Sequence, residues 1–90
     1  MTTFRKQAID LVGRIVRGRM YCVKNKVGIV ITKSAYANIT AQYAAYHRKW
    51  TTQGITRFVL NYEQNLRLMA KPGEQAHELN QLIQKMKQQL

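Results

Sequence analysis

The chain has 90 residues, of which 15 are Lys or Arg and 4 are Asp or Glu, so its net charge is +11 and its pI is about 10.3. A surface this basic attracts polyanions such as nucleic acid, anionic lipid or an acidic protein face, and it excludes an acidic mimic of DNA. The single cysteine, Cys22, excludes a disulfide framework, and no apolar run approaches the roughly 20 residues of a membrane span.

The first predicted element is a helix over about residues 4–17. Thr3 can cap it by accepting a backbone N–H, and Gly18 can end it. Apolar residues at helical spacing form one stripe along it: Phe4, Ala8, Leu11, Val12 and Ile15. The basic residues of this segment can lie off the stripe.

The next segment, RMYCVKNKVGIVITK, favours two short strands because it is rich in β-branched and aromatic residues. The strands are expected at residues 21–23 and 27–31, joined by a turn in which Asn25 tolerates a left-handed conformation. The segment therefore predicts a β-hairpin that lies against helices, since two strands alone are marginal. The alternative is an extended arm that becomes ordered only on a partner.

Three further helices are expected, at residues 34–51, 55–69 and from Pro72 to near the C-terminus. Ser34 can cap the second helix, and Gly54 is expected to interrupt the helical pattern between the second and third helices. Pro72 suits the first turn of the last helix. In each of the three helices, apolar or aromatic residues recur at spacings that alternate between three and four residues, as they do along a helix-packing seam. The seams comprise Tyr36, Ile39, Tyr43, Tyr46 and Trp50; Ile55, Val59, Tyr62, Leu66 and Met69; and Ala76, Leu79, Ile83, Met86 and Leu90.

These elements predict a mainly helical protein of about four helices in a small bundle-like arrangement, with a short β-hairpin after the first helix. Ninety residues make one domain, which we divide into a basic N-terminal part, residues 1–33, and a helical region, residues 34–90. The charge is uneven along it: residues 1–33 carry +7, residues 34–57 carry +3 and residues 58–90 carry +1.

The aromatic residues of the segment SAYANITAQYAAYHRKW allow two interpretations. Exposed rings stack on bases in proteins that bind single-stranded nucleic acid. The same rings share one helical face with Ile39, however, and a small core needs their buried area. We favour the core, with base stacking or a partner interface as the alternatives.

The expected partner-binding residues are basic. The segment RIVRGRMYCVKNK supplies Arg14, Arg17, Arg19, Lys24 and Lys26, and the second helix adds Arg48 and Lys49. Such groups can follow phosphates, face an acidic protein surface or simply remain solvated. No zinc-finger, RNA-recognition or basic-zipper motif is present, and a helix-turn-helix around Gly54 matches only loosely.

No catalytic signature is present, so we expect a protein that is not an enzyme and that needs no cofactor or metal. Glu74 and His77 have the spacing of half a di-iron site, but the chain offers no second copy of this pair and too few further glutamates for such a site. Cys22 has no activating histidine nearby in sequence.

Over most of its length, from MTTFRKQAIDLVGRIVRGRMYC to LRLMAKPGEQ, the chain resembles the Abc anti-RecBCD proteins of lambdoid phages in length, basic character and general sequence. The resemblance implies a protein of the host cytoplasm that binds the RecBCD helicase–nuclease, chiefly through its RecC subunit. It also implies a host prolyl isomerase as an accessory partner. Pro72, the single proline, would then be its target together with Lys71 and Gly73.

The expected function is therefore that of a non-enzymatic phage modulator, which alters the nuclease and Chi-regulated activity of RecBCD to favour phage recombination. Direct DNA contact is a further expectation, and no membrane partner is expected. The alternative from charge alone is a small basic nucleic-acid-binding protein with a regulatory or architectural role.

Overall fold

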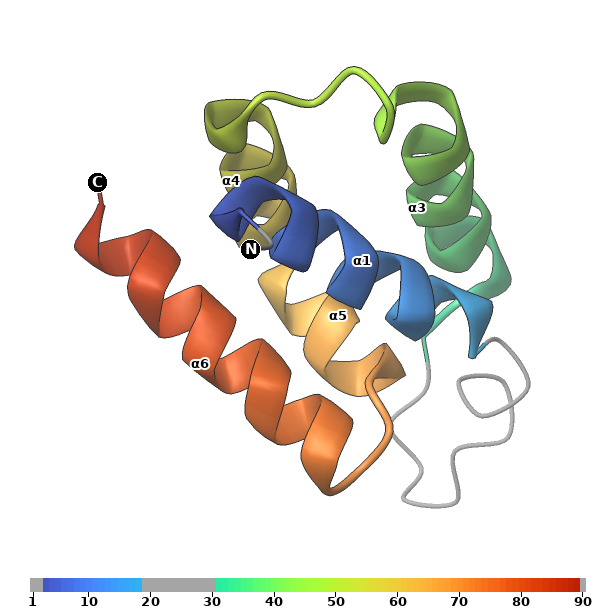
Figure 1. The fold of residues 1–90 in the computed structure, drawn as a ribbon. Coiled ribbons are helices and arrows are strands. Elements are labelled where there is room, and N and C mark those ends of the chain that lie inside the picture. The colour runs from blue at the N-terminus through green and yellow to red at the C-terminus, as the bar shows by residue number, and fades with distance from the viewer. Residues whose placement is uncertain (1–2, 19–30, 90) are drawn as a thin grey trace.

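The computed structural model describes residues 3–18 and 31–89, and these residues are mainly helical, as predicted (Figure 1). The helices are α1 (Phe4–Arg17), α3 (Lys33–Tyr46), α4 (Thr52–Asn61), α5 (Glu63–Met69) and α6 (Glu74–Gln88). The described part thus contains five helices rather than four, and no strand. Apart from Ile31, which is buried, the predicted hairpin lies outside the described residues.

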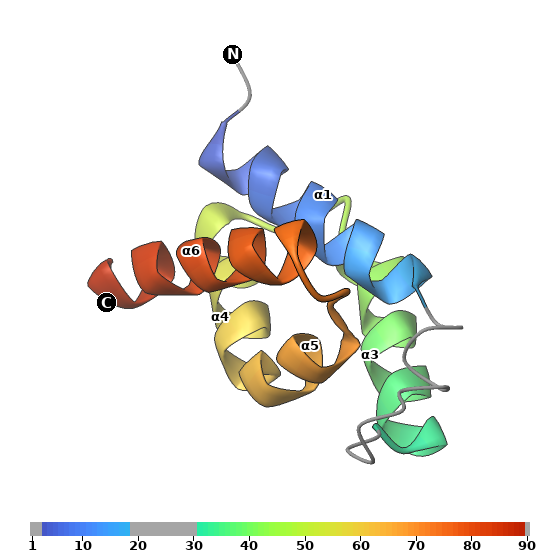
Figure 2. The same ribbon diagram turned by 90° about the horizontal axis from the view of Figure 1, so that it is seen from below.

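Helix α1 is the central element, because it packs against each of the other four helices. In both views α6 and α3 lie on opposite sides of α5, and α1 passes across this group (Figures 1 and 2). The apolar stripe predicted for α1 is buried at Ala8, Leu11, Val12 and Ile15. Helix α1, which lies in the most basic third of the sequence, is therefore the framework of the described part of the fold.

Threonines begin three of the helices. The side chains of Thr3, Thr32 and Thr51 accept backbone N–H groups from Lys6, Ala35 and Gly54, respectively. Each satisfies one of the donors that a helix start leaves without a partner. The caps at Thr3 and Gly18 were predicted, whereas the cap at Ser34 is wrong because Thr32 starts α3 two residues earlier.

The second helix is shorter than predicted, and Gly54 does not interrupt anything. Helix α3 ends at Tyr46, and Thr51, which was predicted to be helical, is extended instead, with φ −78° and ψ 172°, and caps α4. Gly54 then lies inside α4. The helix-turn-helix that was considered around Gly54 therefore has no turn at that residue.

The third predicted helix is two helices, which meet at Tyr62. Tyr62 leaves the helical conformation, with φ −110° and ψ 25°, and ends α4 immediately before α5 begins. The Tyr62 hydroxyl accepts hydrogen bonds from Gln42 at 2.7 Å and from Asn38 at 3.2 Å, both on α3. The break thus coincides with a polar contact between distant parts of the chain.

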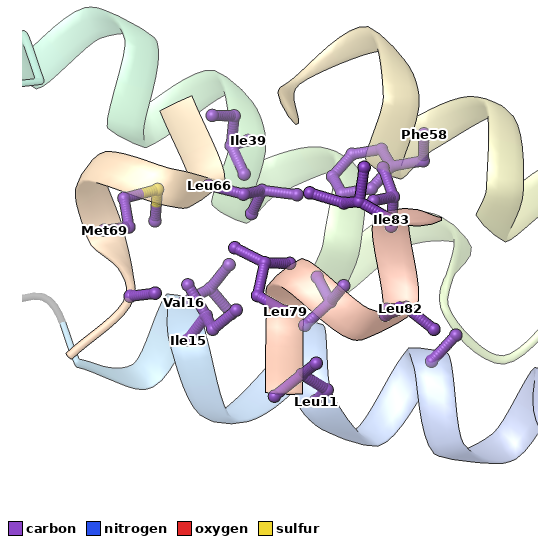
Figure 3. Close-up of a cluster of buried hydrophobic side chains, with 14 of the residues drawn as sticks. Leu11, Ile15, Val16, Ile39, Phe58, Leu66, Met69, Leu79, Leu82 and Ile83 are labelled. Carbon is purple, nitrogen blue, oxygen red and sulfur yellow. The ribbon is translucent and has the colours of Figure 1, made fainter. Parts of the chain in front are cut away.

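The core is one cluster of buried apolar side chains drawn from every helix (Figure 3). The predicted seams supply half of it, and the seam residues that are at most 1% exposed are Ile39, Ile55, Val59, Leu66, Met69, Leu79, Ile83 and Met86. Leu66 lies between Ile39 of α3 and Ile83 of α6 (Figure 3). The seam prediction fails at Tyr46, the last residue of α3, which is 54% exposed.

Gly73, which precedes α6, has φ +94° and ψ −128°. Residues with an L side chain are strained in this conformation, whereas glycine is not. We therefore expect Gly73→Ala to lower the free energy of unfolding by about 1–3 kcal/mol. Space is not the reason, because a Cβ at Gly73 would meet nothing within 4 Å.

D-alanine at the same position separates the two causes. Its preferred backbone region is the mirror image of that of L-alanine, so a semisynthetic protein with D-alanine at position 73 should keep the unfolding free energy of the parent. Urea unfolding measures both variants, and an equal loss in the two would contradict backbone strain as the cause.

Candidate partner-binding surfaces

The tyrosines of α3 fasten that helix to α1. The Tyr36 hydroxyl donates to the carbonyl oxygen of Val16 at 2.8 Å, and the Tyr43 hydroxyl donates to that of Ile9 at 3.2 Å. The two contacts are seven residues apart on both helices, so the predicted aromatic seam packs along α1. Burial raises the pKa of the Tyr43 hydroxyl, and the charge of Arg17 partly offsets this shift. These two rings are therefore structural and are not offered to bases.

The α3–α4 loop, residues 47–51, is held by two aromatic anchors. The His47 ring stacks on Tyr43, with centroids 4.6 Å apart and an interplanar angle of 3°. Trp50 packs on Phe58 at 4.6 Å and meets the edge of Tyr43 at 5.9 Å. The Arg5 guanidinium donates to the carbonyl oxygen of Trp50 at 3.0 Å and joins the start of α1 to the loop.

Arg48 and Lys49 lie between these two anchors and are exposed. Neither forms an ion pair with any described residue. Tyr46, whose ring is exposed, directly precedes the loop. The backbone carbonyl oxygen of Tyr46 accepts the N–H of Lys49 at 2.8 Å. The loop therefore presents two cations and an aromatic ring from a fixed backbone.

Arg14 belongs to a network inside the molecule. Its guanidinium pairs with Asp10 at 3.0 Å on the same helix and with Glu78 at 3.0 Å on α6. The hydrogen bond with Glu78 raises the pKa of Arg14, although partial burial acts in the opposite direction. A role for Arg14 in partner binding stays a prediction, but its charge is already matched by two carboxylates.

Glu63 forms the other ion-pair centre, with Arg67 and Lys87 each at 3.3 Å. Burial alone would raise the pKa of Glu63, but hydrogen bonds from Lys87 and Arg67 outweigh it and lower the pKa. Three of the four acidic residues are thus engaged with cations. Nine described cations remain without an ion pair to a described residue: Arg5, Lys6, Arg17, Lys33, Arg48, Lys49, Arg57, Lys71 and Lys85.

Of the remaining cations predicted in the N-terminal region, the structure describes only Arg17. Arg17 is exposed at the end of α1, close enough to Tyr43 to affect its pKa. Arg19, Lys24 and Lys26 lie outside the described residues. The structure also brings Arg5, a residue that the sequence prediction did not include, to Trp50 of the loop that carries Arg48 and Lys49.

A groove of about 560 Å³ runs between α1 and α6. Its lining includes Phe4, Lys6, Gln7, Asp10, Leu11, Arg14, Glu78, Gln81, Leu82 and Lys85. The Arg14–Glu78 pair joins the two helices here, and Lys6 and Lys85 are the two cations of the lining without an ion pair to a described residue. The groove combines apolar surface with free positive charge, which suits an apolar and acidic segment of a protein partner.

Lys71, Pro72 and Gly73 are all exposed in the turn between α5 and α6. Pro72 lies one residue before the helix cap, so it is not in the first turn of α6 as predicted. The Lys71–Pro72 bond is trans. The Gln75 side chain accepts the N–H of Lys71 at 2.8 Å and holds the turn in place.

Glu74 and His77 belong to no metal cluster: within residues 3–18 and 31–89, no group of three or more His, Cys, Asp or Glu side chains is placed to hold a metal ion. In the same ranges, no helix has both the length and the apolar character needed to cross a membrane. No protein-family model, curated protein or solved structure matches the chain.

Proposed function

We propose that this chain is a non-enzymatic phage modulator that binds the host RecBCD helicase–nuclease through its RecC subunit and alters its nuclease and Chi-regulated activity in favour of phage recombination. The observation that carries the proposal is the resemblance of the sequence, over most of its length, to the Abc anti-RecBCD proteins.

Charge limits the way in which such a protein can act. A protein of net charge +11 cannot imitate DNA in a basic channel, so it must bind an acidic or apolar face of the enzyme. The α1–α6 groove supports this mode, since Leu11, Leu82 and Phe4 line it together with two lysines that have no ion pair to a described residue. The free cations of the first two-thirds would speed association and make it dependent on salt.

Affinity capture from a bacterial lysate tests the proposal. The tagged chain should retain RecBCD subunits after nuclease treatment, and it should form a complex with the purified enzyme without DNA at moderate salt. Capture that contains no RecBCD subunit, or that disappears with nuclease, would refute it.

The exposed turn at Pro72 supports a second part of the proposal, the binding of a host prolyl isomerase. We expect Pro72→Ala to reduce isomerase capture strongly and to leave the circular dichroism spectrum unchanged, because Pro72 lies outside every helix and is exposed. His77→Ala, an exposed substitution on α6 outside the Lys71–Gly73 turn, is the matched control and should retain isomerase capture. Equal isomerase capture by Pro72→Ala and the parent would end this part of the proposal.

A further inference from the structure

The α3–α4 loop, with Arg5 beside it, has the features of a site for a phosphate chain. Arg48 and Lys49 are exposed, and neither has a carboxylate partner among the described residues. The sequence contains no acidic residue between Asp10 and Glu63, so no neighbour along the chain competes with a ligand. We propose that Arg5, Arg48, Lys49 and Tyr46 form a contact site for single-stranded nucleic acid.

The exposed ring distinguishes this ligand from an acidic protein face. Tyr46 is 54% exposed, and it is the one large hydrophobic residue so exposed in the described residues. Proteins that bind single strands combine cations along the backbone with a ring that stacks on a base. The proposal concerns the isolated chain and stands whether or not the chain binds RecBCD.

The anchored backbone adds to the argument. On either side of the two cations along the chain, the half-buried rings of His47 and Trp50 pack on Tyr43 and Phe58, respectively, and Arg5 donates a hydrogen bond to the Trp50 carbonyl oxygen. A loop that is already ordered loses little conformational freedom when a ligand binds. The site is thus assembled before the ligand arrives.

The experiment measures fluorescence anisotropy of a labelled 15-nucleotide oligo-dT against salt, with the full chain. Arg48→Gln/Lys49→Gln should weaken binding about tenfold or more and make the slope of log affinity against log salt shallower by about 1.4, the value for two lost phosphate contacts. Lys33→Gln/Lys85→Gln has the same net charge and should retain most of the affinity and the slope.

The ring is tested separately. Tyr46→Ala should weaken binding by about fivefold or more, whereas Tyr46→Phe, which keeps the ring, should bind as the parent does. Polyglutamate of the same charge as the oligo-dT serves as a second probe, and we expect the chain to bind oligo-dT more tightly than polyglutamate.

Three results would overturn the proposal. The first is the absence of oligo-dT binding at low salt, and the second is an equal loss of affinity in the two double variants. The third is an affinity for polyglutamate that equals that for oligo-dT and is unchanged by Tyr46→Ala. The last result would indicate an acidic protein face as the ligand. Circular dichroism of each variant checks that its helices remain.

Discussion

Leu66→Ala should lower the free energy of unfolding by about 2–5 kcal/mol, because it removes a fully buried side chain and leaves a cavity. The whole stability of a domain is typically only about 5–15 kcal/mol, so this single change removes a large share of it. In a domain of this size each kcal/mol lowers the melting temperature by about 4–8 °C. Urea and thermal unfolding followed by helical circular dichroism measure the loss.

The position of Leu66 explains the size of the effect. Leu66 lies on the short helix α5 between Ile39 of α3 and Ile83 of α6 (Figure 3). No side chain caps the start of α5, and the helix has only seven residues, so its stability must come from tertiary packing. The cavity would therefore loosen the element that separates α3 from α6.

Leu68→Ala is the matched control, since it makes the same substitution two residues away on the same helix. Leu68 is only half-buried, and we expect a clearly smaller loss than at Leu66. Equal losses at the two positions would contradict the placement of Leu66 at the centre of the core.

Local signals that agree with one another made part of the fold predictable. In α1 the cap at Thr3, the apolar stripe and the stop at Gly18 all indicate the same helix, and the structure has that helix. The α1 stripe and the seams together identified most of the core, including Leu66 and Ile83, because helical spacing sorts buried from exposed positions.

The break at Tyr62 was not predictable in this way. The spacing of the seam continues through Tyr62, and no Gly or Pro marks the interruption. The hydrogen bonds from Asn38 and Gln42 that accompany the break come from residues at least 20 positions away. Such contacts exist only once the chain has folded, so local spacing cannot reveal them.

The candidate sites show the same division. The sequence identified Arg48 and Lys49 as free cations but could not tell that Arg14 pairs with Glu78, 64 residues later. The pair of Arg14 with Asp10 is a local signal at helical spacing, and it could have been noticed. Arg5 was missed because only the fold brings it to Trp50.

Gly13→Ala should also destabilise the protein, even though alanine favours helices. A Cβ at Gly13 would overlap the Tyr43 hydroxyl oxygen and lie 3.1 Å from the Tyr43 Cζ. Overpacking costs about 1–3 kcal/mol. The displaced hydrogen bond to Ile9 costs about 0.5–1.5 kcal/mol, and helix propensity returns up to about 1 kcal/mol. We expect a net loss of about 1–3 kcal/mol in the free energy of unfolding.

Tyr43 cannot easily move away, because its ring stacks on His47 and meets the edge of Trp50. Tyr43→Phe removes the overlapping oxygen, so Gly13→Ala/Tyr43→Phe should lose less stability than the sum of the two single variants, by about 0.5 kcal/mol or more. Tyr36→Phe is the matched control. Its hydroxyl also bonds to α1 but is not among the atoms nearest Gly13, so its effect should add to that of Gly13→Ala.

Urea unfolding of the parent, the three single variants and the two double variants measures the coupling. Additive losses in the Gly13–Tyr43 pair would show that the close approach of α3 to α1 is not what requires glycine. Coupling confined to that pair would establish that glycine at position 13 allows the Tyr43 ring to dock on α1. The Tyr43 ring also contacts His47 and Trp50, so Gly13→Ala should loosen the loop that presents Arg48 and Lys49.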